Sequence, residues 1–335
     1  MSHESVIMAI RIMAVRYGFR YVSLVMLLIL PAGCKQLDDW RQSVQQRRGS
    51  RGGEPIPQVS AEQLVHYLNQ QASRLRTLSY AEARMTAREG EGLKGAVSYT
   101  LRGRLAAAQP RYFHLSAQGG LAGGKVDLGS NDERFWIYID APGNKPLYVY
   151  ATHADFAAGK VQLPGNLPFE PDWVLQALGM TTFLPTAPYE AVRIDERHRT
   201  YTLSWAATTP SGQSIRKEIV FAVDTAVGSR PQVLRHLIRN PQGKTICSAE
   251  IKSAHTFPTG SVDPQSGHPH IVQCPNHVVL RWEEQKVEID LRLEDARINQ
   301  PWTAEQMRAE FTPRISGAVP INLAEARFPG EPGRP

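Results

Sequence analysis

Hydrophobic positions follow a helical period first and a period of two afterwards. Over residues 61–76 apolar residues recur every three or four positions, and Ser60 with Gln63 forms a capping-box pattern, so we predict a helix there. From Ala96 onward apolar and polar residues alternate, as expected of half-buried strands. The alternation predicts strands at 96–106, 111–117, 125–129, 133–140, 145–152, 191–195, 199–206, 214–223, 231–239, 244–253, 270–282 and 285–293.

Two more helices are predicted outside these strands. Pro171 and Asp172 begin an apolar face that Gly179 ends, which predicts a helix over 171–178, and a short helix is predicted near 303–310. Ten to twelve antiparallel strands joined by short turns are typical of a barrel or a sandwich. A helix with one apolar face must lie on the sheet to bury that face. We therefore predict a mainly β fold: a curved antiparallel sheet, or unclosed half-barrel, with helices packed on its open side.

The first residues have the pattern of an export signal. Arg16 and Arg20 precede an apolar run of about ten residues, which is too short to span a bilayer core of about 30 Å. Ala32 and Gly33 lead directly to Cys34, although Pro31 stands where a lipobox usually has leucine. We predict that Cys34 receives a diacylglycerol and becomes the mature N-terminus. The alternative is an ordinary signal peptide with an incidental cysteine.

The segment after Cys34 is rich in Gln, Arg, Gly and Pro and cannot bury a core, so we predict a flexible tether. Translation starts at Met1 or at Met13, and both starts leave the signal intact. The predicted organisation is a lipoprotein signal peptide over 1–33, a tether over 34–58, a half-barrel domain over 59–300, and a short helix with a Pro/Gly-rich tail over 301–335.

Charge adds a prediction about the environment of the protein. Removing residues 1–33 takes away three arginines and one glutamate and lowers the formal net charge from +6 to +4. This mild excess fits a position beside anionic lipid and does not predict nucleic-acid binding, which needs a clustered basic surface. Lys35 after the cysteine favours the outer membrane over the inner one under enterobacterial sorting rules. We predict an exported protein anchored in the envelope and facing the periplasm.

Two cysteines remain after Cys34. Cys247 and Cys274 lie on strands predicted to be neighbours, so they form either a disulfide or two buried thiols. No metal-binding pattern is present, and His268 and His270 around a proline are typical of a solvated turn. We predict no cofactor and no metal.

Several segments resemble the bacterial lipoprotein-localisation superfamily, whose members are LolA-like carriers and LolB-like receptors. They are 109–115 (QPRYFHL), 126–136 (VDLGSNDERFW) and 171–179 (PDWVLQALG). The Asp-Leu-Gly-Ser-Asn-Asp-Glu run is most similar to uncharacterised lipoproteins of planctomycete-type bacteria. The resemblance covers about residues 60–295 and implies a half-barrel lidded by helices, with an apolar cavity for acyl chains.

Apolar and aromatic residues occupy both faces of the strands over 111–152, so both faces are expected to be covered. An ordinary filled core would explain this pattern, and so would a cavity for lipid. The cavity-lining candidates share one alternation parity or lie on the middle helix: Phe113, Leu115, Phe135, Ile137, Val149 and Trp173.

Three functions follow. The first is a non-enzymatic, lipid-anchored protein that binds acyl chains or the lipid of lipoprotein cargo. The second is a structural or assembly lipoprotein with a filled core, which acts through protein contacts. The third is an envelope hydrolase using His153 and Asp155, but no Gly-x-Ser-x-Gly turn supplies a nucleophile.

The glycine-rich segment 119–126 almost matches a phosphate-binding loop, yet a strand pattern follows it, so we predict a turn.

Overall fold

The computed structural model describes residues 55–89, 97–120, 123–161, 171–223, 232–262, 264, 267–315 and 317–326. The predicted signal peptide, Cys34 and most of the predicted tether lie outside the described residues. Every element below belongs to the compact unit that begins at Val59. Within the described residues no helix has the length and apolar character needed to cross a membrane.

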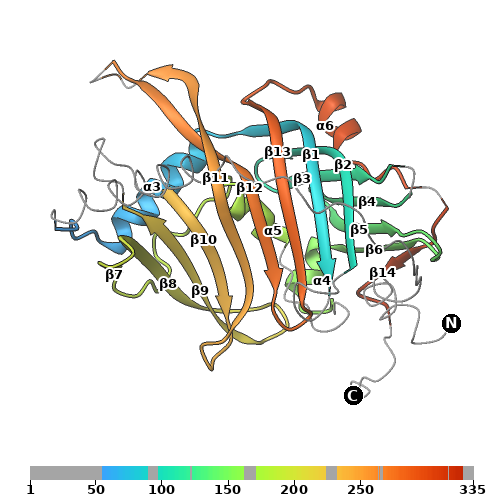
Figure 1. Ribbon diagram of the computed structural model, residues 1–335, viewed down its shortest axis with the longest axis horizontal. Helices are drawn as coiled ribbons and strands as arrows, with labels where there is room; N and C mark the ends of the chain where they lie inside the picture. The colour runs from blue at the N-terminus through green and yellow to red at the C-terminus, as the bar shows by residue number, and fades with distance from the viewer. Residues whose placement is uncertain are drawn as a thin grey trace, which may run out of the picture. The chain divides into compact units, whose positions relative to one another are not determined.

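Fourteen strands of the described unit form one large, curved and unclosed sheet (Figure 1). The prediction of a curved half-barrel is confirmed, with more strands than the ten to twelve expected. Their bounds are β1 Thr77–Glu89, β2 Val97–Ala108, β3 Tyr112–Gln118, β4 Lys125–Ser130, β5 Arg134–Asp140, β6 Leu147–Thr152, β7 Arg193–Asp195, β8 Thr200–Thr208, β9 Ser214–Ala222, β10 Gln232–Arg239, β11 Thr245–Val262, β12 Pro269–Trp282, β13 Val287–Ile298 and β14 Pro320–Asn322.

Most neighbours in the sheet are also neighbours in sequence. The spatial order is β14-β6-β5-β4-β3-β2-β1-β13-β12-β11-β10-β9-β8-β7, so two runs of antiparallel hairpins meet where β1 pairs with β13. Short turns join β4 to β5 and β12 to β13, because Ser130 lies opposite Phe135 and Trp282 lies opposite Val287. Strands β1 and β14 were not predicted, and β14 is parallel to β6.

The two faces of the sheet differ in character. We call the face that carries α3, α4 and α5 the inner face and the other the outer face. Residues opposite one another in neighbouring strands share a face, so Leu115, Leu128, Ile137 and Val149 form one row across the inner face. The main cluster of buried apolar side chains lies on the inner face of β1–β4, β12 and β13 and includes Leu175 of α5 and Leu178 just after it.

Three short helices and one longer one complete the unit. They are α3 Ala61–Ser73, α4 His153–Ala157, α5 Pro171–Ala177 and α6 Ala304–Glu310. The capping box at Ser60 is confirmed, and a second one at Thr303 begins α6. Helix α4 was not predicted: directly after the predicted strand 145–152, the Thr152 hydroxyl accepts from the Asp155 amide and starts a helical turn.

The residues after β13 are part of the sheet's packing rather than only a tail. Phe311, just after α6, is buried against Ala106 and Ala108 on the outer face, and Leu323, just after β14, is buried with Phe135 on the inner face. The C-terminal segment therefore covers parts of both faces.

Candidate functional site

Helix α3 lies on the inner face of β9–β12. Its apolar stripe is buried: Leu64, Val65, Leu68 and Ala72. At the edge of this stripe the Tyr67 ring meets the Phe221 ring of β9 edge to face, with centroids 6.5 Å apart. The helix is thus a lid whose underside is apolar and matches the sheet beneath it.

Two side-chain amide groups of α3 fix the helix in place, because each one both donates a hydrogen bond to and accepts a hydrogen bond from the backbone of a single residue. The Asn69 amide group donates to the Phe183 carbonyl (2.9 Å) and accepts from the Phe183 amide (2.7 Å). The Gln71 amide group does the same with the backbone of Gln273 on β12, at 2.9 and 3.2 Å. Each clamp consists of two hydrogen bonds that can exchange with water, at a net value of about 1 kcal/mol each. The two clamps thus fix the position of α3 against the segment after α5 and against β12.

A narrow cavity lies between α3, the segment after α5 and strands β10–β12. Its volume is about 40 Å³. A water molecule needs about 10–15 Å³ of such volume, so the cavity holds a few waters and no acyl chain with the lid in this position. The lining is Tyr67, Leu68, Gln71, Gln176, Ala177, Gly179, Thr181, Phe183, Gln232, Val233, His236, Ile251, Ala254, Gln273 and Pro275.

Two polar side chains of this lining are buried. Among the described residues neither the Thr181 hydroxyl nor the His236 ring has a hydrogen-bond partner. Burial lowers the pKa of His236 to about 4, so the ring is neutral at pH 7. A buried hydroxyl and a neutral imidazole beside apolar walls can hydrogen-bond a carboxylic acid, ester or amide group.

The sequence did not single out the lid clamps or His236. Asn69 and Gln71 stand at the edges of the α3 stripe, and their role depends on loops and strands far away in sequence. Two amide side chains flanking an apolar stripe were the available signal. This signal does not indicate which backbone groups the two amide side chains bind.

The predicted cavity residues are distributed over three clusters of buried side chains. Phe113 and Leu115 lie in the main cluster, while Phe135, Ile137 and Val149 pack with Val161 and Leu323. The shared face of the five strand residues is confirmed by the pairing register. None of these five residues lines the narrow cavity under α3.

Trp173 joins α5 to a different part of the sheet. Its side chain is 2% exposed, and its ring meets the Trp282 ring at the end of β12 with centroids 5.9 Å apart. Around it lie Ile215, Ile238 and Cys247. The prediction that this helix is buried against the sheet is confirmed, and Trp173 fills space rather than bordering the narrow cavity.

The possible disulfide between Cys247 and Cys274 is not formed, and both residues are buried thiols. They do lie on neighbouring antiparallel strands, as predicted. However, Cys247 is opposite Trp282 and Cys274 is opposite His255, eight positions further along β11. At about 3.3 Å per residue this separates them by roughly 25 Å, whereas a disulfide needs Cα atoms within about 7 Å.

One contact between a serine and a histidine partly resembles the arrangement in a hydrolase. The Ser130 hydroxyl lies 3.2 Å from His153 Nε2, but the same nitrogen lies 2.8 Å from the carbonyl oxygen of Asn131. A carbonyl oxygen only accepts, so Nε2 carries its hydrogen toward Asn131 and cannot take a proton from Ser130. Among the described residues no carboxylate pairs with the ring to orient it, in contrast to a catalytic triad. The predicted partner Asp155 instead pairs with Thr152 and Lys160.

Two further sequence candidates can be placed. The glycine-rich segment 119–126 connects β3 to β4, with the Gly119 amide donating to the Gly124 carbonyl at 2.8 Å, so it is the predicted turn. Within the described part of the chain no three His, Cys, Asp or Glu side chains are grouped to hold a metal ion.

A buried charged cluster, not predicted from the sequence, joins α6 to the outer face. The His114 ring of β3 lies 3.3 Å from Asp127 of β4 and 3.3 Å from Glu310 of α6, and Trp136 donates to Asp127 at 2.8 Å. Burial opposes the charged ring, but the hydrogen bonds and attraction to both carboxylates outweigh it and raise the pKa of His114 to about 9. The imidazolium therefore ties the C-terminal segment to the sheet at neutral pH.

No protein-family model and no curated protein matches this chain. Solved structures with a similar backbone path include the following three. An outer membrane lipoprotein-sorting protein domain from Vibrio parahaemolyticus is 9% identical, with 74% of this chain and 97% of that chain covered and a TM-score of 0.43. A DUF1329 family protein from Desulfovibrio piger is 10% identical, with 75% and 95% covered and a TM-score of 0.43.

The third structure is a LolA superfamily protein from Nitrosomonas europaea. It is 8% identical, with 76% of this chain and 98% of that chain covered and a TM-score of 0.34.

Proposed function

We propose that this protein is a lipid-anchored envelope protein that binds an acyl chain between α3 and the inner face of its sheet, without catalysing a reaction. The observation that carries the proposal is the lid. The apolar face of α3 lies over an apolar strand surface, and the Asn69 and Gln71 amide groups hold the helix there. The cavity beneath it is the closed form of the site.

The lining supplies both parts of an acyl ligand's chemistry. Leu68, Val233 and Ile251 offer apolar contact for the chain, and His236 with Thr181 offers hydrogen bonds to a carboxyl or ester group. Burying about ten methylene groups contributes about 8 kcal/mol, from which association and lid displacement subtract several. We expect a dissociation constant on the order of millimolar.

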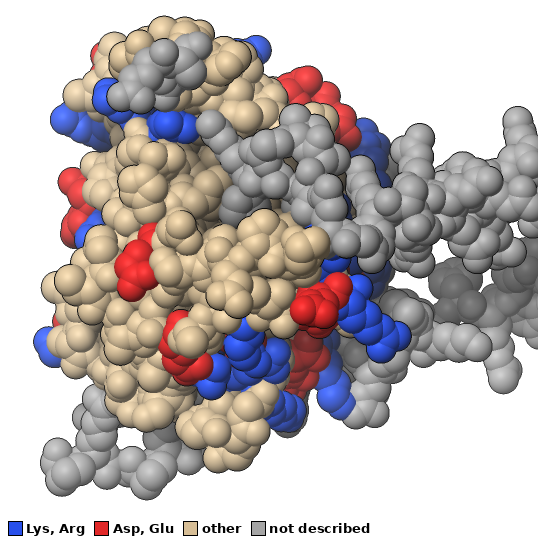
Figure 2. Space-filling model, turned by 90° about the vertical axis from the view of Figure 1, so that its left-hand side faces the viewer, with Lys and Arg blue, Asp and Glu red and all other residues tan. Residues whose placement is uncertain are grey.

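The end of the molecule near the lid suits an apolar ligand. Figure 2 shows this side, where uncharged side chains make up most of the visible described surface. Leu184, directly after the residue that Asn69 clamps, is 73% exposed, and Ile194 of β7 is 37% exposed. Leu184 therefore offers an apolar contact at the rim, whereas Ile194 lies between the exposed charged side chains of Arg193 and Asp195.

The proposal is tested with cis-parinaric acid, a fatty acid that fluoresces in apolar sites. Ala254→Phe places a phenyl ring in the cavity and should abolish binding, whereas His255→Phe places a phenyl ring at the neighbouring exposed position, in place of the imidazole, and should not. Asn69→Ala should speed association by loosening the lid, and Gln70→Ala, on the exposed side of the helix, should leave the rate unchanged. Equal binding by wild type and Ala254→Phe would place the ligand elsewhere.

A second function is favoured by the tight packing of the predicted cavity residues. Phe135, Ile137 and Val149 are covered by Val161 and Leu323, as in a filled core. An assembly lipoprotein acting through protein contacts would have such a core and no lipid affinity. If the folded protein does not bind parinaric acid, the assembly role replaces acyl-chain binding as the proposed function.

The anchor is the remaining part of the proposal. Cells fed labelled palmitate should incorporate it into the wild type and not into Cys34→Ala. Labelling of both proteins alike would rule out Cys34 as the lipidated residue.

A further inference from the structure

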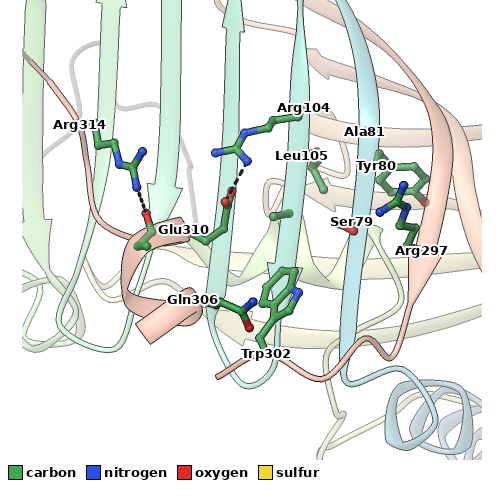
Figure 3. A pocket seen from close by; sticks show the side chains of 12 residues that line it. Ser79, Tyr80, Ala81, Arg104, Leu105, Arg297, Trp302, Gln306, Glu310 and Arg314 are labelled. Atoms are coloured by element: carbon green, nitrogen blue, oxygen red, sulfur yellow. Dashed lines mark hydrogen bonds and ion pairs between the residues drawn. The ribbon is translucent and has the colours of Figure 1, made fainter. Parts of the chain in front are cut away.

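A second and larger cavity lies on the outer face beside α6. Its volume is about 580 Å³, within the range of small-molecule sites. Strands β1, β2 and β13 form its base, and the segment from Trp302 to Arg314 forms its wall (Figure 3). It lies on the opposite face of the sheet from the cavity under α3.

The charged groups lining this cavity are three arginines and one glutamate. Arg104 donates to Glu310 at 3.0 Å, and Arg314 donates to the Ala309 carbonyl at 3.0 Å. Arg297 makes no hydrogen bond or ion pair with any described residue. The second oxygen of Glu310 is already bonded to the protonated His114. The cavity therefore holds an excess of positive charge that its own carboxylate does not neutralise.

The side chains are arranged around an open centre. In Figure 3, Arg104 and Arg297 come from opposite sides of the cavity, and the Trp302 indole lies below them. The Trp302 ring packs at a tilted angle of 47° against the buried Phe311 ring, with centroids 5.5 Å apart. Strand positions and a packed indole give the site fixed walls, as a binding site requires.

We propose that this cavity binds a phosphate-bearing ligand. Guanidinium groups match the oxygens of phosphate in fork geometry, and a phosphate ester brings up to two charges and three acceptor oxygens to share among several arginines. A carboxylate would bring one charge. Trp302 offers a flat surface for the organic part.

The organic part has room beyond the phosphate. Trp302 also lines a neighbouring cavity of about 450 Å³ with Arg76, Thr77 and Gln300. An organic phosphate that extends across the indole contacts both cavities. We therefore expect glycerol 3-phosphate to bind more tightly than inorganic phosphate.

Two sources of the same chemistry are distinguished by two probes. The purified protein is titrated with glycerol 3-phosphate by calorimetry, and it is sedimented with vesicles of phosphatidylcholine with or without phosphatidylglycerol. Binding of glycerol 3-phosphate alone indicates a soluble phosphate ester. Sedimentation that requires phosphatidylglycerol indicates a lipid headgroup.

The matched variants are Arg297→Gln and Arg102→Gln. Both arginines are exposed and on the outer face, and Arg102 is not part of the cavity. Losing one charge-assisted contact should weaken binding roughly tenfold in Arg297→Gln, with a change under about twofold in Arg102→Gln. Equal losses in the two variants would overturn the site in favour of general surface charge. Absence of binding to both probes, or equal affinity for acetate, would overturn the assignment of phosphate.

Discussion

The buried imidazolium of His114 makes a pH-dependent contribution to stability that can be isolated. The folded pKa of about 9 lies well above the ordinary value of 6.5. A shift of that size corresponds to about 3 kcal/mol of the free energy of unfolding. The ring is almost fully buried, with 6% of its side chain exposed, so solvent screening reduces this magnitude little.

The sign follows from proton binding. Between pH 6.5 and 9 the folded state holds the proton on His114 and the unfolded state releases it, so stability falls as pH rises. The contribution is fully present below pH 6.5 and is lost as pH passes 9. In His114→Gln the contribution is absent at every pH. The wild type should therefore exceed the variant by about 3 kcal/mol more at pH 6 than at pH 10.

Urea unfolding of both proteins at pH 6, 7, 8, 9 and 10 gives the measurement. Titrating groups that do not contact His114 are common to the two proteins and cancel in the difference between them; His114 lowers the pKa values of Asp127 and Glu310, so only those two carboxylates respond to its loss. His198→Gln is the control, because His198 is exposed beside Asp195 and its loss should change stability by less than about 0.5 kcal/mol. A difference between wild type and His114→Gln that stays constant with pH would refute the assignment of a buried imidazolium.

Three further changes test the packing and the lid cavity. Trp173→Ala removes a ring that packs on Trp282 and should lower the free energy of unfolding, measured by urea titration, by about 3–5 kcal/mol. Its control, Leu184→Ala at an exposed position, should lower it by less than about 0.5 kcal/mol. Equal losses in the two variants would contradict the burial of α5. Gly103→Ala places a Cβ 1.8 Å from the Ser116 carbonyl oxygen of the next strand and should destabilise the protein by about 3 kcal/mol, and a neutral result would mean that β2 and β3 are spaced more widely. His236 has a pKa lowered to about 4, so as pH falls the unfolded state binds a proton on this ring before the folded state does, and stability is lost between pH 6.5 and 4. His236→Phe should lose about 3 kcal/mol less of its free energy of unfolding over this range than the wild type. Parallel curves of stability against pH for the two proteins would contradict the burial of a neutral ring.

The sequence predicted strands well where alternation was continuous and failed where a bulge interrupted it. In β1, Leu78 and Tyr80 face inward with Ala83 and Met85, so the inward positions change from even to odd numbers. The irregularity between Tyr80 and Ala83 absorbs the extra residue. A search for strict period two sees two short, alanine-rich fragments instead of the strand at the middle of the sheet.

Site residues were harder to predict because their roles depend on packing between distant segments. The parity of Phe113 and Ile137 was readable, but whether their face borders empty space depends on residues such as Val161 and Leu323 that cover it. The same limit applies to the cysteines. Neighbouring strands were predictable, while the register that separates Cys247 from Cys274 was not.

The pairing of β1 with β13 has a consequence for how the chain folds. Leu78 lies opposite Ile298, so the contact that unites the two runs of hairpins joins segments from near the two ends of the unit. Each run can form from local hairpins, but each then exposes one long edge until the other arrives. Contacts between such distant segments slow folding, and an open strand edge invites pairing with another chain. We expect the closing of this seam to be the rate-limiting step and the half-folded runs to be the species that needs protection from aggregation.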